Sequence, residues 1–378
     1  MTQPRNDDNQ ADSVSAGPSP LARLIHRAID NNAGWLPFDR FMALALYAPG
    51  LGYYAHGSRK FGLMPASGSD FVTAPELSPM FGAALAAQRR QAREATATHE
   101  VGEFGAGTGA LAAQLLQALG DRVQRYTIVD LSGSLRARQE QVLAPFGERV
   151  RWLDALPDSM MGVVVGNEVL DALPVQLLHW DGVQWFERGV VAAGGGFAFA
   201  DRATQLRPPL AAAFLPGTTT EIHLQAEAFI RTLADRLERG AAFFIDYGFP
   251  EAEYYLLERS DGTLMCHRAH RADSDPLSDI GAKDITAHVN FSAIALTAQE
   301  AGFEVLGYTA QARFLLNCGF ATLMSDAQQR GDWPALAAAQ KIIAEHEMGE
   351  LFKVIGLVKG VAAFDAIGFA DGDRSHRL

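Results

Sequence analysis

Apolar and polar positions alternate between a strand period and a helix period from residue 99 onward, and this alternation is the strongest structural signal in the chain. Strands are predicted at 101–104, 126–129, 150–153 and 163–166. Helices are predicted between them at 109–118 and 135–143. The strand segments are continuously apolar, which is typical of parallel strands covered by helices on both faces. This order predicts an α/β fold built on a doubly wound sheet.

The chain before residue 99 follows a helical period instead. Helices are predicted at 21–29, 38–46 and about 76–93. Residues 50–75 are rich in Gly, Tyr, Phe and Ser, which suits neither a linker nor a regular core element. We expect residues 21–98 to form an N-terminal helical cap, preceded by a disordered tail over residues 1–20.

The alternating order breaks again after residue 174. Two apolar runs flank Asp181-Gly182, a strong signal for a β-hairpin. A helix is predicted at 225–239, and further strands at 242–246, 303–308 and 352–359. The sequence therefore predicts a core over residues 99–361, followed by a tail over residues 362–378. Helical and hairpin insertions in this core are expected near 175–225, 250–290 and 311–346.

Composition supports a folded chain and narrows the class of its partners. Of 378 residues, 48% are hydrophobic, which is enough to bury a core. Acidic residues outnumber basic residues by 44 to 32, which gives a net charge of −12. Such a chain is a poor candidate for nucleic acid, because phosphate backbones require clustered cations. It attracts cationic molecules instead.

Compartment signals point to the cytoplasm. The two cysteines, Cys266 and Cys318, form no CxxC pair and are expected to be reduced thiols. No apolar run is long enough for a membrane helix, so we expect no membrane insertion. The N-terminal tail has no apolar segment and more acids than arginines, unlike a targeting peptide.

The most informative peptide joins the first predicted strand to its helix. It contains, in order, Glu103, Gly105, Gly107 and Gly109. Glycines at a strand-to-helix turn let the backbone approach a ligand at the helix N-terminus. The G-x-G-x-x-A spacing also matches the dinucleotide fingerprint, and both NAD and S-adenosylmethionine enzymes place an acid such as Asp130 after the second strand.

Three features favour S-adenosylmethionine over NAD. Glu103 occupies a normally apolar strand position, where a buried carboxylate needs a cation such as the methionyl ammonium. Gly109 completes the E-x-G-x-G-x-G pattern of class I methyltransferases, and Asp154 ends the third strand, where an acid can meet the adenine amino group. Asp130 is assigned to the ribose, and the adjacent Leu131 to the same cofactor site. The alternative is a solvated Glu103 beside a glycine turn that binds nothing.

A second polar group follows the fourth strand. Asn167, Glu168 and Asp171 lie at the carboxyl edge of the predicted sheet, beside the glycine loop. Two carboxylates in one pocket can clamp a guanidinium and assist the loss of its proton, whose pKa is about 12.5 to 13.8. The alternative is that Asn167 caps a helix whose first turn contains both acids.

Several further peptides are distinctive beyond the glycine loop. They are Phe41-Met-x-x-Ala-Leu-Tyr47, Leu51-Gly-Tyr-Tyr54, Asp70-Phe-Val-Thr73-Ala-Pro-Glu76-Leu-Ser-Pro-Met-Phe-Gly82, Asn167-Glu168-x-x-Asp171-Ala-Leu-Pro174, Asp246-Tyr-Gly248 and Asp284-Ile-Thr-Ala-His288-Val-Asn290-Phe291. With the glycine loop, these peptides resemble the MidA-type methyltransferases over residues 21–361. The resemblance implies a Rossmann-like class I methyltransferase that uses S-adenosylmethionine to methylate an arginine of a protein partner. Mitochondrial members of this family assist the assembly of respiratory complex I, so a complex I subunit is the implied partner.

The resemblance also implies a lid over the cofactor. Phe71, Thr73, Pro75 and Glu76 would shield the sulfonium from water, and the alternative is a cap that only packs against the sheet. His288 is a further candidate catalytic residue, because a neutral imidazole near the substrate could receive a proton. The alternative, which is slightly favoured, is that His288 is a buried structural histidine. The oligomeric state stays open, with a homodimer among the alternatives.

A cluster of Cys, His and Asp residues and two rival functions are the alternatives to methyl transfer. Cys266, His267, His270 and Asp273 imitate a metal cluster but lack its ligand spacing, so we interpret them as a surface hairpin and expect no metal. The rival functions are an NAD-dependent oxidoreductase and a non-catalytic assembly factor that kept the fold.

Overall fold

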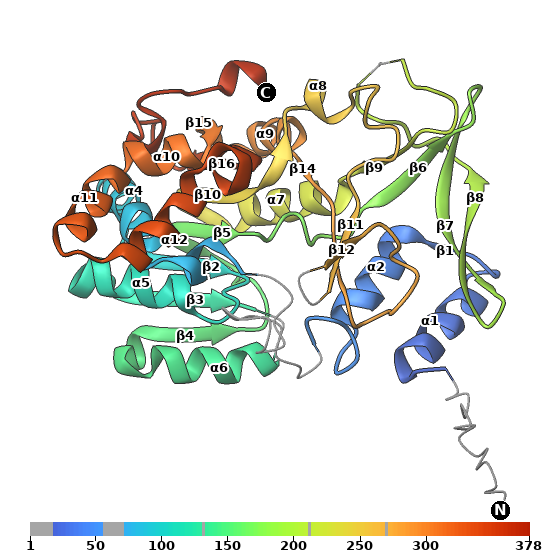
Figure 1. Ribbon diagram of the computed structural model, residues 1–378, viewed down its shortest axis with the longest axis horizontal. Coiled ribbons are helices and arrows are strands. Elements are labelled where there is room, and N and C mark those ends of the chain that lie inside the picture. Colours follow the sequence, from blue (N-terminus) through green and yellow to red (C-terminus); the bar gives the residue numbers. More distant parts are fainter. Residues whose placement is uncertain (1–17, 56–71, 131–132, 211–212, 269–270) are drawn as a thin grey trace, which may run out of the picture.

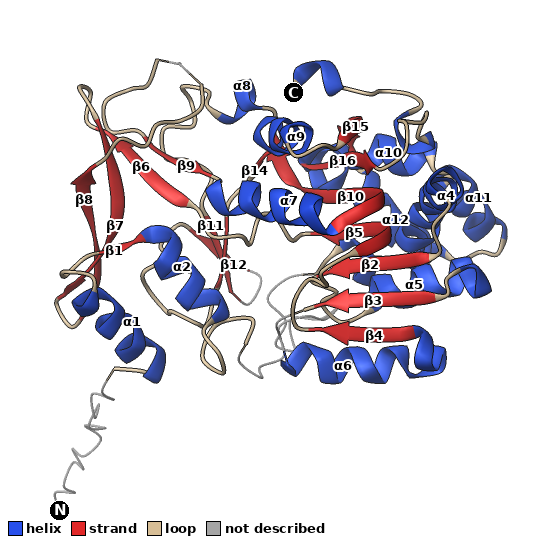
Figure 2. Cartoon of the chain, turned by 180° about the vertical axis from the view of Figure 1, so that it is seen from behind, coloured by secondary structure: helices blue, strands red, loops and turns tan. Residues whose placement is uncertain are grey.

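A helix-covered central sheet and a second, smaller sheet lie side by side (Figure 1). The computed structural model describes residues 18–55, 72–130, 133–210, 213–268 and 271–378. The two N-terminal helices, α1 (Pro20–Asn31) and α2 (Phe38–Tyr47), lie with the smaller sheet, and the alternating β-α region forms the central one (Figures 1 and 2).

The central sheet has the strand order β15-β16-β10-β5-β2-β3-β4. Its strands are β2 (Glu100–Phe104), β3 (Arg125–Val129), β4 (Val150–Leu153), β5 (Met160–Asn167), β10 (Leu237–Phe249), β15 (Glu304–Ala310) and β16 (Phe352–Lys359), and the short β14 (Val289–Asn290) pairs with β10. The neighbouring strands in the stretch β10-β5-β2-β3-β4 are all parallel. Strand β16 runs antiparallel to both of its neighbours, β10 and β15. The order reverses between β2 and β5, which is the switch point where such sheets bind ligands.

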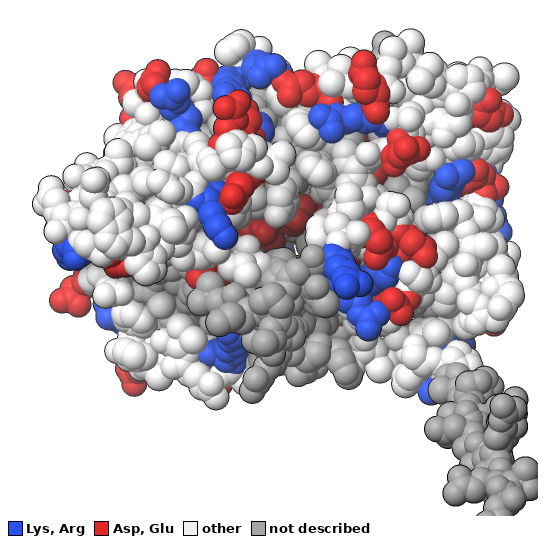
Figure 3. All heavy atoms as spheres, in the orientation of Figure 1, with Lys and Arg blue, Asp and Glu red and all other residues white. Residues whose placement is uncertain are grey.

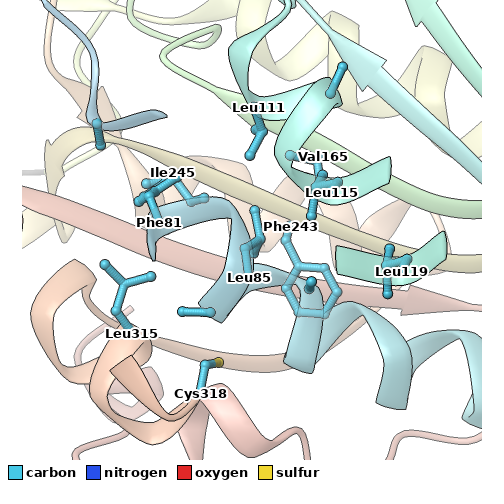
Figure 4. Packing of buried hydrophobic residues seen from close by; sticks show 14 of the residues in the cluster. Phe81, Leu85, Leu111, Leu115, Leu119, Val165, Phe243, Ile245, Leu315 and Cys318 are labelled. Atoms are coloured by element: carbon cyan, nitrogen blue, oxygen red, sulfur yellow. The ribbon is translucent and has the colours of Figure 1, made fainter. Parts of the chain in front are cut away.

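Alternate residues of the central strands contribute to two separate hydrophobic cores. Val163 and Val165 of β5 face one core, together with Phe243 of β10, while Val164 and Phe244 face the other. The first core is covered by α4 (Pro79–Thr96), α5 (Ala110–Leu119), α6 (Gly133–Leu143), α10 (Gln311–Asn317), α11 (Phe320–Gln329) and α12 (Trp333–Ile343), and Figure 4 shows its packing. The second core is covered by α7 (Leu224–Arg236) and α9 (Phe291–Glu300).

The smaller part of the molecule combines two antiparallel sheets with the N-terminal helices. Its larger sheet contains β1 (Leu36–Pro37), β6 (Gln176–Trp180), β7 (Trp185–Ala193), β8 (Gly196–Ala203) and β9 (Thr219–Ile222). Its three-stranded sheet contains β11 (Met265–Arg268), β12 (Arg271–Asp273) and β13 (Asp284–Thr286). The apolar faces of α1 (Pro20–Asn31) and α2 (Phe38–Tyr47) pack against residues of both sheets. This part therefore forms one hydrophobic unit that faces the carboxyl edge of the central sheet.

The fold confirms the predicted α/β class and most of the predicted elements. The predicted third helix is instead two helices, α3 (Ala74–Leu77) and α4, because Ser78 interrupts the first and caps the second by accepting a hydrogen bond from the Met80 amide at 3.2 Å. Strands β8, β9 and β13 were not predicted, and neither was the short α8 (Glu251–Tyr254). The C-terminal residues pack against the core, where Phe369 contacts Phe314 at a ring distance of 5.3 Å.

Candidate active site

A cavity of about 560 Å³ lies at the carboxyl edge of the central sheet and is closed from the other side by α2, β11 and β13. Seven acidic residues line it: Glu76, Glu103, Asp130, Asp154, Glu168, Asp171 and Asp284. No Lys or Arg lies among the described residues that line the cavity. Acidic side chains are visible in the hollow between the two parts of the molecule (Figure 3). Such a cavity favours cationic ligands.

Most of the residues that sequence reasoning singled out meet at this cavity. The lining includes Thr73, Pro75, Glu76, Glu103, Gly105, Gly107, Asp130, Asp154, Asn167, Glu168 and Asp171. Gly109 and His288 are not among the lining residues. Leu131 and Phe71 lie outside the described residues, so their predicted roles stay predictions.

The glycine loop adopts a backbone that favours glycine at each of its three positions. Gly105, Gly107 and Gly109 have φ angles of 59°, 53° and 84°, in the left-handed region. The Gly105 amide donates a hydrogen bond to the Val129 carbonyl at 3.2 Å, which closes the turn against β3. Gly109 instead occupies the N-cap of α5, so it shapes the turn without lining the cavity. The first residues of α5 thus reach the cavity, where a helix N-terminus suits a carboxylate.

Glu103 is buried, with 3% of its surface exposed, so the alternative of a solvated strand-end residue is wrong. Its carboxylate accepts a hydrogen bond from the Tyr126 hydroxyl. Burial raises the pKa of Glu103 to about 7, although the buried Arg89 guanidinium nearby opposes this shift. Arg89 itself donates to the Glu100 and Val163 carbonyls at 3.3 Å. A cation in the cavity would favour the ionised form of Glu103.

Gln139 supports the binding site without lining the cavity, and the sequence analysis missed it. Its fully buried amide donates to the Gly107 carbonyl at 3.0 Å and to Asp130 Oδ2 at 2.9 Å, and it accepts from Trp152 Nε1 at 2.9 Å. One side chain therefore fixes both the glycine loop and the Asp130 carboxylate. Asp154, in contrast, lies at the exposed rim, 3.5 Å from Arg136 Nη1. No sequence motif marked Gln139, because a helix-face glutamine usually faces solvent.

Replacing Gln139 by Leu should weaken S-adenosylmethionine binding about tenfold, since a hydrogen bond that fixes a charged group contributes about 1.5–3 kcal/mol. The matched control is Gln88→Leu. Gln88 is equally buried and accepts from the Gly368 amide at 2.7 Å, whereas Gln139 bonds the glycine loop and Asp130. Isothermal titration calorimetry should show weakened binding for Gln139→Leu only. Equal losses in both variants would contradict a role for Gln139 at the cofactor site.

Thr73, Pro75 and Glu76 form a wall of the cavity at the start of α3. Gln114 of α5 holds this wall by donating to the Pro75 carbonyl at 2.6 Å, while its own side-chain oxygen accepts from the Gly82 amide at 3.0 Å. Burial raises the pKa of Glu76, and its Oε2 has no hydrogen-bond partner among the described residues. A buried acceptor without a partner fits a site that receives a ligand donor.

The segment after Asn167 is a turn, so the interpretation of Asn167 as a helix cap is wrong. Asn167 instead donates from Nδ2 to Glu168 Oε1 at 2.9 Å. Burial and the neighbouring Asp246 raise the pKa of Glu168 to about 8. The same two causes, with Glu168 added, raise the pKa of Asp171.

The wall opposite Glu168 comes from the smaller part of the molecule. The Tyr54 hydroxyl donates to both carboxylate oxygens of Asp284, at 2.9 and 2.8 Å, and the rings of Tyr47 and Tyr54 stack at 5.5 Å. Sequence reasoning placed these residues in matching peptides without assigning them a role. Aromatic faces beside carboxylates suit a planar cation such as guanidinium.

His288 lies behind the cavity wall instead of in it. Its ring stacks on Phe249 at 5.3 Å and meets the edge of Tyr247 at 6.0 Å. Burial lowers the pKa of His288 to about 4. These contacts are typical of a packed, neutral histidine. In the predicted surface hairpin, Cys266 is buried and His267 reaches the cavity lining, while His270 lies outside the described residues.

The buried acids make the stability of the unliganded protein depend on pH. Folding raises the pKa of Glu103 and Asp246 to about 7 and that of Glu168 to about 8, from ordinary values of 4.5, 3.8 and 4.5. At pH values between the ordinary pKa and the raised pKa of each group, the folded state binds more protons than the unfolded state. The free energy of unfolding therefore falls as pH rises through this range. We expect the thermal midpoint to fall from pH 5 to pH 8, with a shallower slope in Glu168→Gln. A midpoint that rises across this range would contradict the assignment.

The fold and the acidic cavity define a class I methyltransferase. A family model for S-adenosyl-L-methionine-dependent methyltransferases matches residues 80–309, and the chain belongs to this family. A crystal structure from Burkholderia thailandensis with bound S-adenosyl-homocysteine is 50% identical, has a TM-score of 0.90, and covers 96% of this chain and 100% of its own. S-adenosylmethionine is therefore the cofactor, and the NAD alternative is not supported.

Curated relatives match along most of the chain. The "Protein arginine methyltransferase NDUFAF7 homolog, mitochondrial" of Drosophila melanogaster is 26% identical over 98% of this chain and 93% of its own length. The "Protein arginine methyltransferase NDUFAF7, mitochondrial" of Danio rerio is 25% identical over 92% of this chain and 88% of its own. These matches confirm the resemblance to the MidA-type methyltransferases.

The expected compartment is corrected by the same relatives. The sequence analysis pointed to the cytoplasm, whereas the relatives from Drosophila melanogaster, Danio rerio and Mus musculus are all named as mitochondrial proteins. Among the described residues, no helix has the length and apolar character to cross a lipid bilayer.

Proposed function

We propose that the protein transfers a methyl group from S-adenosylmethionine to an arginine side chain of a protein partner. The observation that carries this proposal is the cavity lining, in which seven acids meet no Lys or Arg among the described residues. Both the methyl donor and an arginine acceptor are cations. Each would supply positive charge to balance the acidic side chains of the cavity walls. The printed names of the curated relatives support the same acceptor.

The donor half of the cavity is assigned to the side of β2, β3 and β4. Glu103 would bind the methionyl ammonium, Asp130 the ribose hydroxyls and Asp154 the adenine amino group. Gly105 and Gly107 would allow the backbone to approach the methionyl part. When bound, S-adenosylmethionine supplies an electrophilic methyl group on its sulfonium. Glu76 Oε2 has no hydrogen-bond partner within the described part of the chain, and with the wall from Thr73 to Glu76 it supports a role in covering this group.

The acceptor half is assigned to Glu168 and Asp171. Their carboxylates would bind two edges of a guanidinium by charge-assisted hydrogen bonds, which fixes the attacking nitrogen. One of them must also accept the proton that the nitrogen loses. Burial and Asp246 raise the pKa of Glu168 to about 8. This value suits the role, because a general base works best with a pKa near the working pH. Asn167 would orient Glu168 through its 2.9 Å hydrogen bond.

The partner is proposed to be a protein, and a subunit of respiratory complex I is the first candidate. This candidate rests on the family resemblance and on the names of the relatives. A homodimer is a further proposal, which size-exclusion chromatography with light scattering would test directly.

Charge recognition can be tested without turnover. In the presence of S-adenosylhomocysteine, a peptide with one arginine should bind at least tenfold more tightly than the same peptide with citrulline, its uncharged isostere. The reason is that citrulline loses the charge while keeping the shape. Calorimetric titration of both peptides measures this ratio. Equal affinities would contradict a carboxylate site for guanidinium.

A further inference from the structure

Asp246 is a buried carboxylate at the end of β10 that supports the cavity without lining it. Only 1% of its surface is exposed, and it is not among the cavity-lining residues. Its Oδ2 accepts hydrogen bonds from three consecutive amides, those of Val169, Leu170 and Asp171, at 3.1, 2.8 and 3.2 Å. Its Oδ1 accepts from the Tyr247 amide at 2.9 Å. A single carboxylate thus caps the whole turn that follows Glu168.

The turn that Asp246 caps holds Glu168 in an unfavourable backbone conformation. Glu168 has a φ of 54°, in the left-handed region that residues with a Cβ atom rarely adopt. Its amide donates to the Ile245 carbonyl at 2.9 Å, which extends the pairing of β5 with β10 by one residue. Such a conformation persists only where the surroundings determine it. Asp246 and the end of β10 supply these surroundings.

Two further tethers hold the other end of the same turn. The Ala287 amide donates to the Asp171 carbonyl at 2.9 Å, and the Tyr47 hydroxyl donates to the Ala172 carbonyl at 2.8 Å. The turn is therefore bound to β10, to the residue after β13 and to α2. Without Asp246, three adjacent amides would lose their acceptor, while these two tethers would remain.

We infer that Asp246 is a positioning residue that holds the turn from Glu168 to Asp171 in the one conformation that presents both carboxylates to the acceptor. This inference rests on the proposed function, because that function assigns the acceptor to Glu168 and Asp171. Asp246 acts through the backbone and does not touch the acceptor itself.

The charge of Asp246 gives the inference a second readout. The groups that act on Glu168 are Asp246 and Tyr247 from β10, Asp171 and Asn167 from its own segment, Glu76 from α3 and Asp284 from β13. Asp246 is the largest contributor after burial, and its negative charge raises the pKa of Glu168. Removing that charge should lower the pKa of Glu168. A side chain with a purely structural role elsewhere would leave this pKa unchanged.

The test is Asp246→Asn, assayed for methyl transfer to an arginine peptide across pH. We expect kcat to fall about 100-fold, the effect of misplacing a reacting group by about 1 Å. The acid limb of kcat/KM should move to lower pH, while the affinity for S-adenosylmethionine stays within about twofold of wild type, since the donor half lies on other strands. Wild-type rates and an unshifted acid limb would overturn the inference.

The matched control is Glu221→Gln. Glu221 is fully buried and also caps backbone amides, those of Thr263 and Leu264 at 2.9 and 3.0 Å, but it does not line the cavity. It should lose stability while keeping the wild-type acid limb. If Asp246→Asn does not fold, Asp246→Glu keeps the charge and displaces the acceptor oxygens. That variant should lose at least tenfold in kcat with an unshifted limb, and wild-type kcat would overturn the inference.

Failure of the proposed function would be recognised separately. If the wild-type protein methylates no arginine, a crystal structure of Asp246→Asn decides the positioning role alone. Movement of Glu168 out of the left-handed region would support the inference, and an unchanged turn would overturn it.

Discussion

Glu168→Gln should lower kcat for methyl transfer about 1000-fold, within the range of about 10²–10⁴ that general acid–base catalysis contributes. Gln keeps the size of the side chain but can neither accept the proton nor pair with the guanidinium charge. Because burial already disfavours the ionised form of Glu168, the substitution should leave the thermal midpoint unchanged or raise it. Steady-state kinetics with a fixed arginine peptide measure the effect.

Donor binding separates this catalytic loss from a general defect. The affinity of Glu168→Gln for S-adenosylmethionine should stay within about threefold of wild type. The control variant is Glu238→Gln on β10, whose carboxylate accepts a hydrogen bond from the exposed Ser159 hydroxyl, outside the cavity lining. A kcat of Glu168→Gln that matches Glu238→Gln would remove Glu168 from the mechanism.

The second large effect is expected for Glu103→Gln, which should weaken S-adenosylmethionine binding about 100-fold. A hydrogen bond between charged groups contributes about 1.5–3 kcal/mol, and it is stronger where water is excluded. The pKa of about 7 on Glu103 adds a pH dependence, because only the ionised carboxylate attracts the ammonium. Wild-type affinity should therefore fall as pH drops below about 7, and the Gln variant should lose this dependence.

Glu100→Gln is the matched control for Glu103. Both residues lie on β2, but Glu100 is partly exposed and pairs with Arg125 at 2.9 Å instead of facing the cavity. Calorimetric titration of both variants between pH 6 and pH 8 makes the comparison. If the affinity of Glu103→Gln equals that of Glu100→Gln, Glu103 does not bind the ammonium.

The sequence predicted the central sheet well because local patterns determine it. Continuous apolar runs such as 163–166 face helices on both sides, and the order of elements then restricts the topology. The glycine loop was equally readable, because its three residues adopt backbone angles that favour glycine. Local sequence patterns did not predict β8 and β9. These strands pair with β7 and β6, and tertiary contacts decide such pairing.

The roles of Gln139 and Asp246 could not be predicted from the sequence for a common physical reason. Gln139 and Asp246 act by hydrogen bonds to segments 32 and 75 to 77 positions away, which no spacing rule can reveal. The alternative that Asn167 caps a helix is wrong because of similarly distant contacts. The amides of the segment after Asn167 find their acceptor on β10, so the turn needs no helical hydrogen bonds. For His288, the alternative of a buried structural histidine fits the contacts, because its ring stacks on Phe249 behind the cavity wall.

Tandem mass spectrometry of a protein acceptor tests the central claim most directly. The purified protein would be incubated with methyl-labelled S-adenosylmethionine and a recombinant complex I subunit, beside Glu168→Gln as the inactive control. The account predicts labelled methyl groups on an arginine side chain, with little label in the control. Label on lysine or another residue type, or equal label with Glu168→Gln, would contradict it.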